Sequence, residues 1–225
     1  MPPGLPLHPS HSLPPGVAHL ALGDVGSTNA EAMALARDGE RGPLWVTAER
    51  QLQGRGRRGR PWVSEAGNLY ASLLLTDPAP IDRLGTLPLV AALGVYNALR
   101  PFFARTPQAL AIKWPNDILV QNSAKVWLKC AGILIENTWR GTEWDGTLIG
   151  VGVNVNSAHA GANRRCALSE FTRSPITVEH VKARLSEHLL HALEVNVAPD
   201  SYERHLVGCG LTKQMSVQGQ SGMGK

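Results

Sequence analysis

The segment Gly-Arg-Gly-Arg-Arg-Gly-Arg at residues 54–60 constrains this chain most, because so many adjacent charges cannot enter a core. With Arg50 it brings five arginines and no acidic residue into positions 50–60. The guanidinium groups repel one another unless solvent or an anion screens them, and the glycines let the backbone turn tightly. Guanidinium also offers a planar fork of donors that fits phosphate or carboxylate. We therefore predict a mobile loop that becomes ordered around a phosphorylated or adenylated ligand.

Two other interpretations of this arginine-rich loop compete with the first. One is a solvated basic loop that binds nothing, and the other is an arginine-rich contact with nucleic acid. The formal net charge of +4 is no larger than the charge of the loop, so the rest of the chain is close to neutral. This balance weakens a general nucleic-acid-binding function.

Length and composition indicate one sizeable soluble domain, with a small appendage at most. No stretch approaches the roughly 20 apolar residues that a membrane span requires, so we expect no membrane association. Residues 1–16 are rich in Pro and His and lack the pattern of a signal peptide, which predicts a disordered tail. The three scattered cysteines form no disulfide framework or metal-ligand pair and fit a reducing cytoplasm.

Hydrophobic periodicity predicts strands joined by turns and a few separate helices. A capping box from Thr28 to Glu31 is expected to open the first helix, and Gly39 to end it. Segregated helices and strands predict an α+β fold rather than alternating βαβ units. The expected strands are 17–22, 45–48, 68–75, 109–113, 118–121, 130–136 and 147–155, and the expected helices are 29–38, 82–103, 177–197 and 200–207.

Four further segments carry polar or charged side chains where predicted elements begin or end. Pro115 fixes its own φ and biases Trp114 toward an extended conformation, so Asn116 and Asp117 should project from a stiff turn. Each segment alone also fits a structural role: helix capping, ordinary turn composition, a solvated lysine or close backbone packing. The segments are Ser27-Thr-Asn29, Lys113-Trp-Pro-Asn-Asp117, Lys129-Cys-Ala-Gly-Ile-Leu-Ile-Glu136 and Gly150-Val-Gly-Val-Asn-Val-Asn156.

In this order, the four segments and the arginine-rich loop resemble the catalytic domain of biotin–protein ligases over residues 17–200. The family shares its fold with lipoate ligases and resembles class II aminoacyl-tRNA synthetase cores, which implies a mixed β-sheet flanked by helices. The resemblance implies activation of biotin with ATP to biotinyl-5′-adenylate and transfer to a lysine of a biotin carboxyl carrier domain of a carboxylase. Mg²⁺ is expected because pyrophosphate is a highly charged leaving group. A homodimer is left open.

The same resemblance implies that Lys129, Arg57 and Asp117 are catalytic. Lys129 would bridge the biotin carboxylate and the α-phosphate and offset their repulsion. Asp117 would assist deprotonation of the acceptor lysine or help hold magnesium. The implied binding residues are Ser27, Thr28, Asn29 and Gln51 at the biotin head group, Gly132, Leu134 and Gly150 in the biotin pocket, Arg55 and Arg57 at the adenylate, Arg58, Arg60, Trp62 and Asn154 near the nucleotide, and Gly54, Lys113 and Asn116 as further contacts.

Three features depart from the usual family pattern. The interval between Asp117 and Lys129 is several residues longer, which makes Lys125 a rival for the catalytic lysine, although register with Gly-Ile-Leu-Ile-Glu favours Lys129. No helix-turn-helix segment precedes the domain, so we expect a monofunctional ligase that binds no DNA. Residues 201–225 are expected to form a short remnant where the family usually has a small β-barrel domain, which puts full affinity for ATP and carrier in doubt.

Three alternatives to a competent biotin–protein ligase stay open. A lipoate or octanoate–protein ligase on the same fold would need an open apolar channel, whereas Ser27-Thr-Asn29 and Gln51 favour a polar head group. A truncated ligase would bind biotin but transfer it poorly. A nucleic-acid-binding domain would use the arginine-rich loop and leave the other four segments unexplained.

Overall fold

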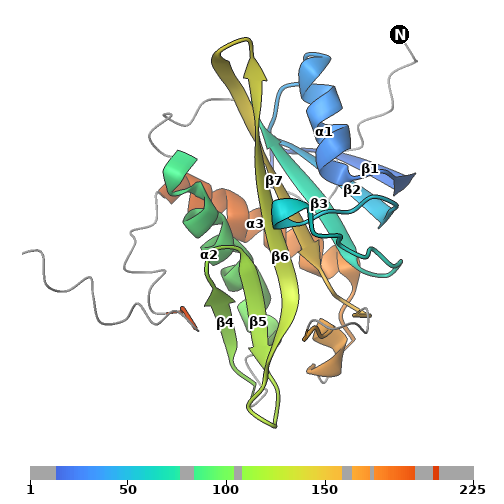
Figure 1. Cartoon of the computed structure of the whole chain (residues 1–225), viewed down its shortest axis with the longest axis vertical. Coiled ribbons are helices and arrows are strands. Elements are labelled where there is room, and N and C mark those ends of the chain that lie inside the picture. The colour runs from blue at the N-terminus through green and yellow to red at the C-terminus, as the bar shows by residue number, and fades with distance from the viewer. Residues whose placement is uncertain are drawn as a thin grey trace, which may run out of the picture.

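The computed structural model describes residues 14–76, 84–103, 108–158, 164–172, 175–195 and 205–207. Within them the centre is a seven-stranded mixed sheet in the order β1-β2-β3-β7-β6-β5-β4 (Figure 1). Strands β1 and β2 are parallel, and every other neighbouring pair is antiparallel. The strands are β1 (Ala18–Val25), β2 (Leu44–Gln51), β3 (Leu69–Leu75), β4 (Leu110–Lys113), β5 (Asp117–Gln121), β6 (Trp127–Arg140) and β7 (Glu143–Val153).

Helices cover both faces of this sheet. Helices α2 (Leu87–Leu99) and α3 (Val178–Val195) pack against each other on one face, and α1 (Thr28–Arg37) lies on the other (Figure 1). Short 3-10 helices span Arg57–Gly59, Arg100–Phe103 and Leu168–Glu170. No helix in the described part of the chain is long and apolar enough to span a membrane.

Alternation along the strands divides the core into two clusters. On β2, Trp45 belongs to the larger cluster under α2 and α3, whereas Leu44 and Val46 belong to the smaller cluster under α1. Trp45 also donates its indole N–H to Ser186 of α3 at 2.8 Å, which anchors that helix. Because both faces are covered, the central strands read as nearly continuous apolar runs.

The predicted α+β fold is confirmed, and every predicted strand is present with shifted bounds: β1, β2, β5 and β6 extend beyond the predicted ranges, β3 and β4 each begin one residue later, and β7 begins and ends earlier. The helix predicted over 82–103 begins only at Leu87, because Pro88 occupies the first turn, where its missing N–H is tolerated. It gives way to 3-10 geometry at Arg100. Residues 205–207 are not helical, since Leu206 pairs with Ile112 of β4. Residues 1–13, 82–83, 196–204 and 208–225, which carry parts of other predictions, lie outside the described residues.

The predicted capping box at α1 is wrong. Ser27, not Thr28, is the N-cap residue, and no side chain caps the helix. The Thr28 hydroxyl instead donates to Gln51 Oε1 at 3.1 Å. A tertiary hydrogen bond has therefore displaced the local one. Gly39 follows the helix with a φ of +97°, as expected for a glycine after a helix end.

Gly94 sets the close approach of α2 to α3. A Cβ at this position would lie 2.9 Å from Leu189 Cα and 3.3 Å from the His188 carbonyl oxygen, which are backbone atoms. We expect Gly94→Ala to lower the free energy of unfolding by about 1–3 kcal/mol, despite the better helix propensity of alanine. Urea denaturation measures this, with Gly23→Ala as a control because a Cβ there meets nothing within 4 Å. A stabilised Gly94→Ala protein would contradict the prediction.

His19 on β1 makes stability depend on pH. Its ring lies 2.8 Å from the Thr47 hydroxyl, and burial lowers the pKa of His19, as does nearby Lys182, while Glu179 opposes them. The unfolded chain therefore binds the proton more tightly, so stability rises with pH from the lowered pKa to the ordinary value of 6.5 and is lost on acidification. We expect His19→Gln to reduce this pH dependence, measured by urea unfolding at acidic and neutral pH. Equal pH dependence in both proteins would refute it.

Candidate functional site

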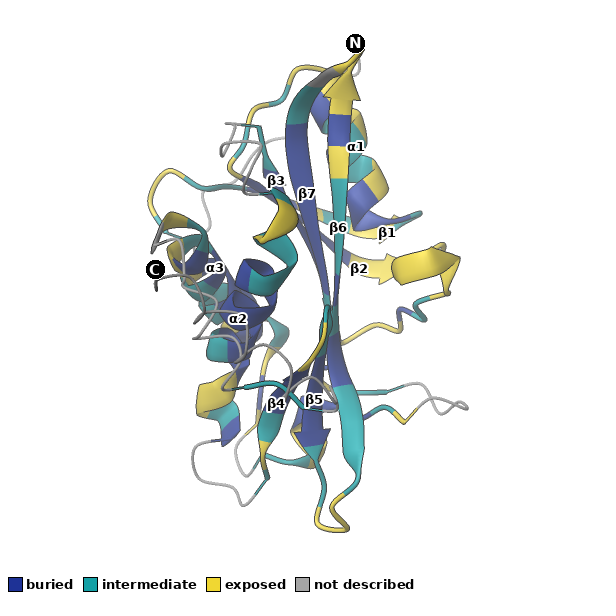
Figure 2. Cartoon of the chain, turned by 60° about the vertical axis from the view of Figure 1, so that its left-hand side comes forward, coloured by how far each residue is buried: buried dark blue, intermediate teal, exposed yellow. Residues whose placement is uncertain are grey.

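One large pocket, of about 980 Å³, lies on the α1 face of the sheet, beyond the N-terminus of that helix. Its walls are the arginine-rich loop, the turn between β4 and β5, and residues 164–165. Figure 2 shows the loop as an exposed projection beyond the end of β2. A pocket of this size matches the usual range for small-molecule and cofactor sites.

Glycines on β6 and β7 form the floor of the pocket. Ile133 and Val151 face the α2–α3 core, so their neighbours Gly132, Gly150 and Gly152 face the opposite side. A Cβ at Gly150 would collide with the Asn29 amide of α1. The three glycines therefore let other side chains lie directly on the sheet.

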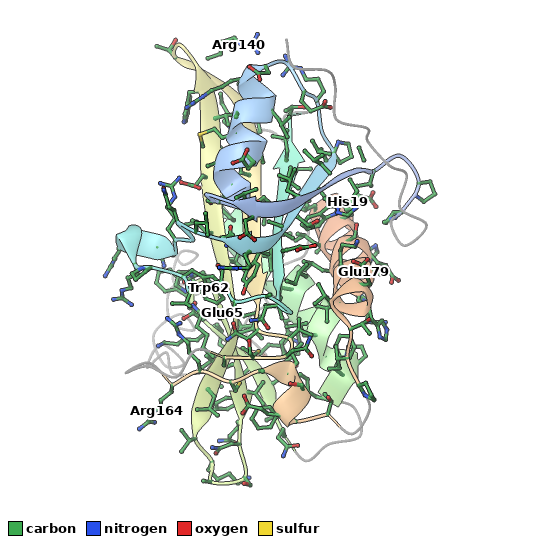
Figure 3. All side chains as sticks on the ribbon, turned by 90° about the vertical axis from the view of Figure 1, so that its right-hand side faces the viewer. His19, Trp62, Glu65, Arg140, Arg164 and Glu179 are labelled. Atoms are coloured by element: carbon green, nitrogen blue, oxygen red, sulfur yellow. The ribbon has the colours of Figure 1, made fainter. Side chains whose placement is uncertain are left out.

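Trp62, which follows the arginine-rich loop, rests on this floor (Figure 3). A Cβ at Gly152 would lie 2.7 Å from the indole, and one at Gly132 would lie 2.9 Å from it. Lys129 Nζ is 5.0 Å from the ring centroid, and the Arg165 guanidinium carbon is 5.7 Å from it. The indole thus lies within cation–π range of two cationic groups.

A polar network fixes the end of the pocket at the N-terminus of α1. Both the backbone N–H and the hydroxyl of Thr28 donate to Gln51 Oε1, at 2.9 and 3.1 Å. Gln51 Nε2 in turn donates to Ser64 Oγ at 3.1 Å. The buried hydroxyl of Ser72 lies within hydrogen-bond distance of Thr28 Oγ1 and Asn29 Oδ1. These side chains present a polar surface whose orientation is set by the protein itself.

At the other end, Lys129 and Asp117 form an ion pair at 2.6 Å across β5 and β6. Asn116 holds the adjoining turn to β6 twice, since its backbone oxygen accepts from the Ile133 N–H at 2.9 Å and its Nδ2 donates to the Ile133 oxygen at 3.0 Å. The stiff turn expected from Pro115 therefore also has hydrogen bonds that fix its position.

The pocket lining is strongly cationic. Asp117 is the only acidic residue among the described lining residues. Such an excess of guanidinium and ammonium groups fits an anionic ligand with several negative oxygens. The cationic lining residues are Arg55, Arg57, Arg58, Arg60, Lys113, Lys129, Arg164 and Arg165.

The two rival lysines occupy different surroundings. Lys129 lines the pocket, whereas Lys125 lies in the exposed turn before β6 with a φ of +61° and is not part of the lining. The segment between Asp117 and Lys129 thus forms the β5–β6 hairpin, with Lys125 at its exposed turn and Lys129 in the pocket.

Two thiols adjoin the site without being reactive groups. Burial raises the pKa of the Cys166 thiol to about 12 and that of Cys130 well above its ordinary value. Neither is a thiolate at neutral pH, so neither is a nucleophile for acyl transfer.

Most residues singled out from the sequence line this pocket. Gly54 and Asn154 do not. Gly54 sits at the stem of the loop, where its carbonyl accepts from Trp62 N–H at 2.8 Å, and buried Asn154 donates to the Cys166 carbonyl at 3.2 Å. Those that line it are Ser27, Thr28, Asn29, Gln51, Arg55, Arg57, Arg58, Arg60, Trp62, Lys113, Asn116, Asp117, Lys129, Gly132, Leu134 and Gly150.

Sequence reasoning missed Arg164 and Arg165. The backbone N–H of Lys129 donates to the Arg164 carbonyl at 2.9 Å, and Lys129 pairs with Arg165 in a parallel bridge. Arg164 projects outward at the pocket rim (Figure 3). Their only signal in the sequence is a pair of arginines with no acidic residue between positions 158 and 169.

Comparison with known proteins gives one family. The model of the biotin/lipoate A/B protein ligase family matches residues 28–154. A biotin–[acetyl-CoA-carboxylase] ligase of Paracoccus denitrificans is 43% identical over 159 residues, which cover 70% of this chain and 61% of that protein. Its Mycobacterium tuberculosis namesake is 35% identical over 141 residues, 61% of this chain and 49% of that protein. The chain thus spans about half to three-fifths of these relatives.

A solved structure shows the same architecture. The biotin protein ligase of Aquifex aeolicus in complex with biotin and ATP superposes with a TM-score of 0.64 and 31% identity, covering 78% of this chain and 70% of that one. The fold is thus shared with a protein of this group.

Proposed function

The chain belongs to the biotin/lipoate A/B protein ligase family, and from this premise we propose that it activates biotin with ATP and biotinylates a protein lysine. The observation that carries the proposal is the two-ended pocket. A fixed polar surface at Thr28 and Gln51 lies at one end, the Lys129–Asp117 pair lies at the other, and glycines form the floor between them. One end suits an uncharged polar head group, and the other suits reacting anions.

In the first step, a biotin carboxylate oxygen attacks the α-phosphorus of ATP. A bond forms between these atoms, the bond from the α-phosphorus to the bridging oxygen breaks, and pyrophosphate leaves. Two anions must approach each other, so cationic donors that are already in position lower the barrier. We assign Lys129 to the carboxylate and α-phosphate, and Arg55, Arg57, Arg58, Arg60 and Lys113 to the surrounding oxygens.

In the second step, the amine of the acceptor lysine attacks the biotinyl carbonyl, and AMP leaves with the bonding electrons. The amine must lose a proton, and Asp117 at the pocket wall is the acidic residue placed to accept it. In the free protein this carboxylate holds Lys129 at 2.6 Å. It would therefore serve both to orient Lys129 and to assist deprotonation.

Magnesium would bind chiefly through the substrate. Among the described residues no group of three or more His, Cys, Asp or Glu side chains could hold a metal. Mg²⁺ is commonly bound by one or two carboxylates together with substrate phosphates, and Asp117 offers one such carboxylate. When bound, the ion would neutralise charge on the leaving pyrophosphate.

The polar end of the pocket favours biotin over lipoate or octanoate. Ser27, Thr28, Asn29 and Gln51 converge there, and a ureido group can exchange hydrogen bonds with such amides and hydroxyls. An aliphatic acyl tail would cover this polar surface without exchanging hydrogen bonds with it, at a cost of about 1–3 kcal/mol for each donor or acceptor that loses water and gains no partner. We further infer a catalytic domain over 17–200, a carboxylase carrier domain as acceptor and a cytoplasmic location, supported by the named relatives and the cysteine usage.

The direct test incubates the protein with ATP, Mg²⁺, biotin and a purified biotin carboxyl carrier domain. We expect biotin-dependent pyrophosphate release and carrier that avidin detects, with lipoate and octanoate as substrates that fail. Adenylate formation without transfer would indicate a ligase impaired in its second step. If folded protein forms neither product, the proposal is overturned.

The two lysines give a matched pair of variants. We expect Lys129→Ala to slow adenylate formation by about 10²–10³-fold, as for other preorganised donors to a developing charge. Lys125→Ala should keep a rate near that of the wild type, because Lys125 lies in an exposed turn outside the pocket. Biotin-dependent pyrophosphate release measures both, and the reverse order of effects would transfer the role to Lys125.

A further inference from the structure

Glu136 joins the polar end of the pocket to the arginine-rich loop. Its Oε2 accepts from Asn29 Nδ2 at 2.7 Å, and its Oε1 lies 3.5 Å from an Arg55 guanidinium nitrogen. Asn29 belongs to the N-terminus of α1, and Arg55 is the first arginine of the loop. Glu136 itself does not line the pocket, so its carboxylate acts on residues that do.

The other end of the loop is tied to the same network. Gln51 pairs with Ser64 in an isolated bridge, and the Ser64 hydroxyl lies 3.2 Å from the Trp62 carbonyl. Through Gln51 this end reaches Thr28, next to Asn29. Both stems of the loop therefore converge on the N-terminus of α1.

The backbone hydrogen bonds within residues 54–60 hold the loop to itself, whereas Leu52 and Gln53 just before it donate at 2.8 Å to carbonyls at residues 25–26, where β1 ends. Gly56 N–H donates to the Arg60 carbonyl at 2.7 Å, and Arg60 N–H donates to Arg57. Among the described residues, no acidic side chain pairs with Arg57, Arg58 or Arg60. Folding this loop against Lys129 brings positive charges together. The Glu136 carboxylate offsets part of their repulsion through its pair with Arg55.

We propose that Glu136 is a positioning residue that docks the arginine-rich loop beside the polar end of the pocket before any ligand binds. The inference rests on the proposed function for its ligands, biotin and ATP. If both ligands need the docked loop, each dissociation constant is divided by the fraction of free protein in which the loop is docked. A substitution that lowers this fraction weakens the binding of either ligand alone. Once one ligand is bound and the loop is docked, the second ligand binds with its full affinity.

Glu136→Gln tests this with little change in shape. Glutamine keeps an oxygen that accepts from Asn29 but loses the negative charge facing Arg55. We expect biotin alone, and α,β-methylene-ATP alone, to bind up to about fivefold more weakly by calorimetry, since the pair is partly exposed. With the other ligand saturating, each should recover its wild-type affinity. A loss that persists in the ternary complex would overturn the proposal, as would unchanged affinities for the single ligands.

A second readout needs no ligand. Trypsin should cut the free Glu136→Gln protein after Arg55, Arg57 or Arg58 severalfold faster than the wild type, with the cut sites identified by mass spectrometry. An equal cutting rate would refute the docking role even if the protein proved not to bind biotin. Wild-type protein that is protected from trypsin but binds no biotin would instead refute the proposed function alone.

Asp24→Asn is the matched control. It removes the same charge and breaks another arginine–carboxylate pair, Arg50–Asp24 at 3.6 Å, outside the pocket. We expect no change in ligand affinity or trypsin cleavage, and an effect equal to that of Glu136→Gln would overturn the proposal. A double-mutant cycle repeats the substitution in an Arg55→Gln protein, where it should have no further effect on either readout; a full effect there would also overturn the proposal.

Discussion

The alternation of side chains along β6 and β7 is the constraint on which the rest of the structure depends. One face of these strands carries Ile133 and Val151 into the core beneath α2 and α3, while glycines on the other face leave the sheet open. The antiparallel ladder between the strands holds both arrangements in one register. A slip by one residue would move the glycines into the core and place branched side chains in the pocket. Core and pocket are therefore specified together.

The electrostatics of the pocket follow from where its charges sit. The cationic side chains come from the arginine-rich loop, the end of β4, β6 and the segment at 164–165, and most of them are exposed to solvent. Water screens their mutual repulsion in the free protein. An anionic ligand that displaces this water would strengthen the interaction of every cation with it, because the local dielectric constant falls.

The sequence predicted the elements well where a local pattern decided the outcome. The apolar runs that became β3 and β7 and the amphipathic helix α3 lie within a few residues of the predicted bounds. Prediction failed where tertiary contacts overrode local preference. The Thr28 hydroxyl donates to Gln51 and does not cap the helix. Leu206, which was predicted to be helical, pairs with Ile112 of β4.

The same division applies to the site. Residues in compact motifs, such as Lys113 to Asp117, could be assigned from the sequence because their spacing is local. Arg165 could not, since its nearness to Lys129 arises from a bridge between segments more than thirty residues apart. Glu136 lay in a recognised motif, but its two partners come from α1 and the loop. Only the folded chain brings those three side chains together.

Departures from ordinary folding rules concentrate at this pocket. Glycines interrupt two central strands, which weakens a strand in the absence of another reason. Positive charges cluster on one loop although they repel one another. The two clusters of buried apolar residues on the faces of the sheet show no such departure. Selection for stability alone would remove each departure, so their coincidence in one place indicates that the pocket was selected for binding and chemistry.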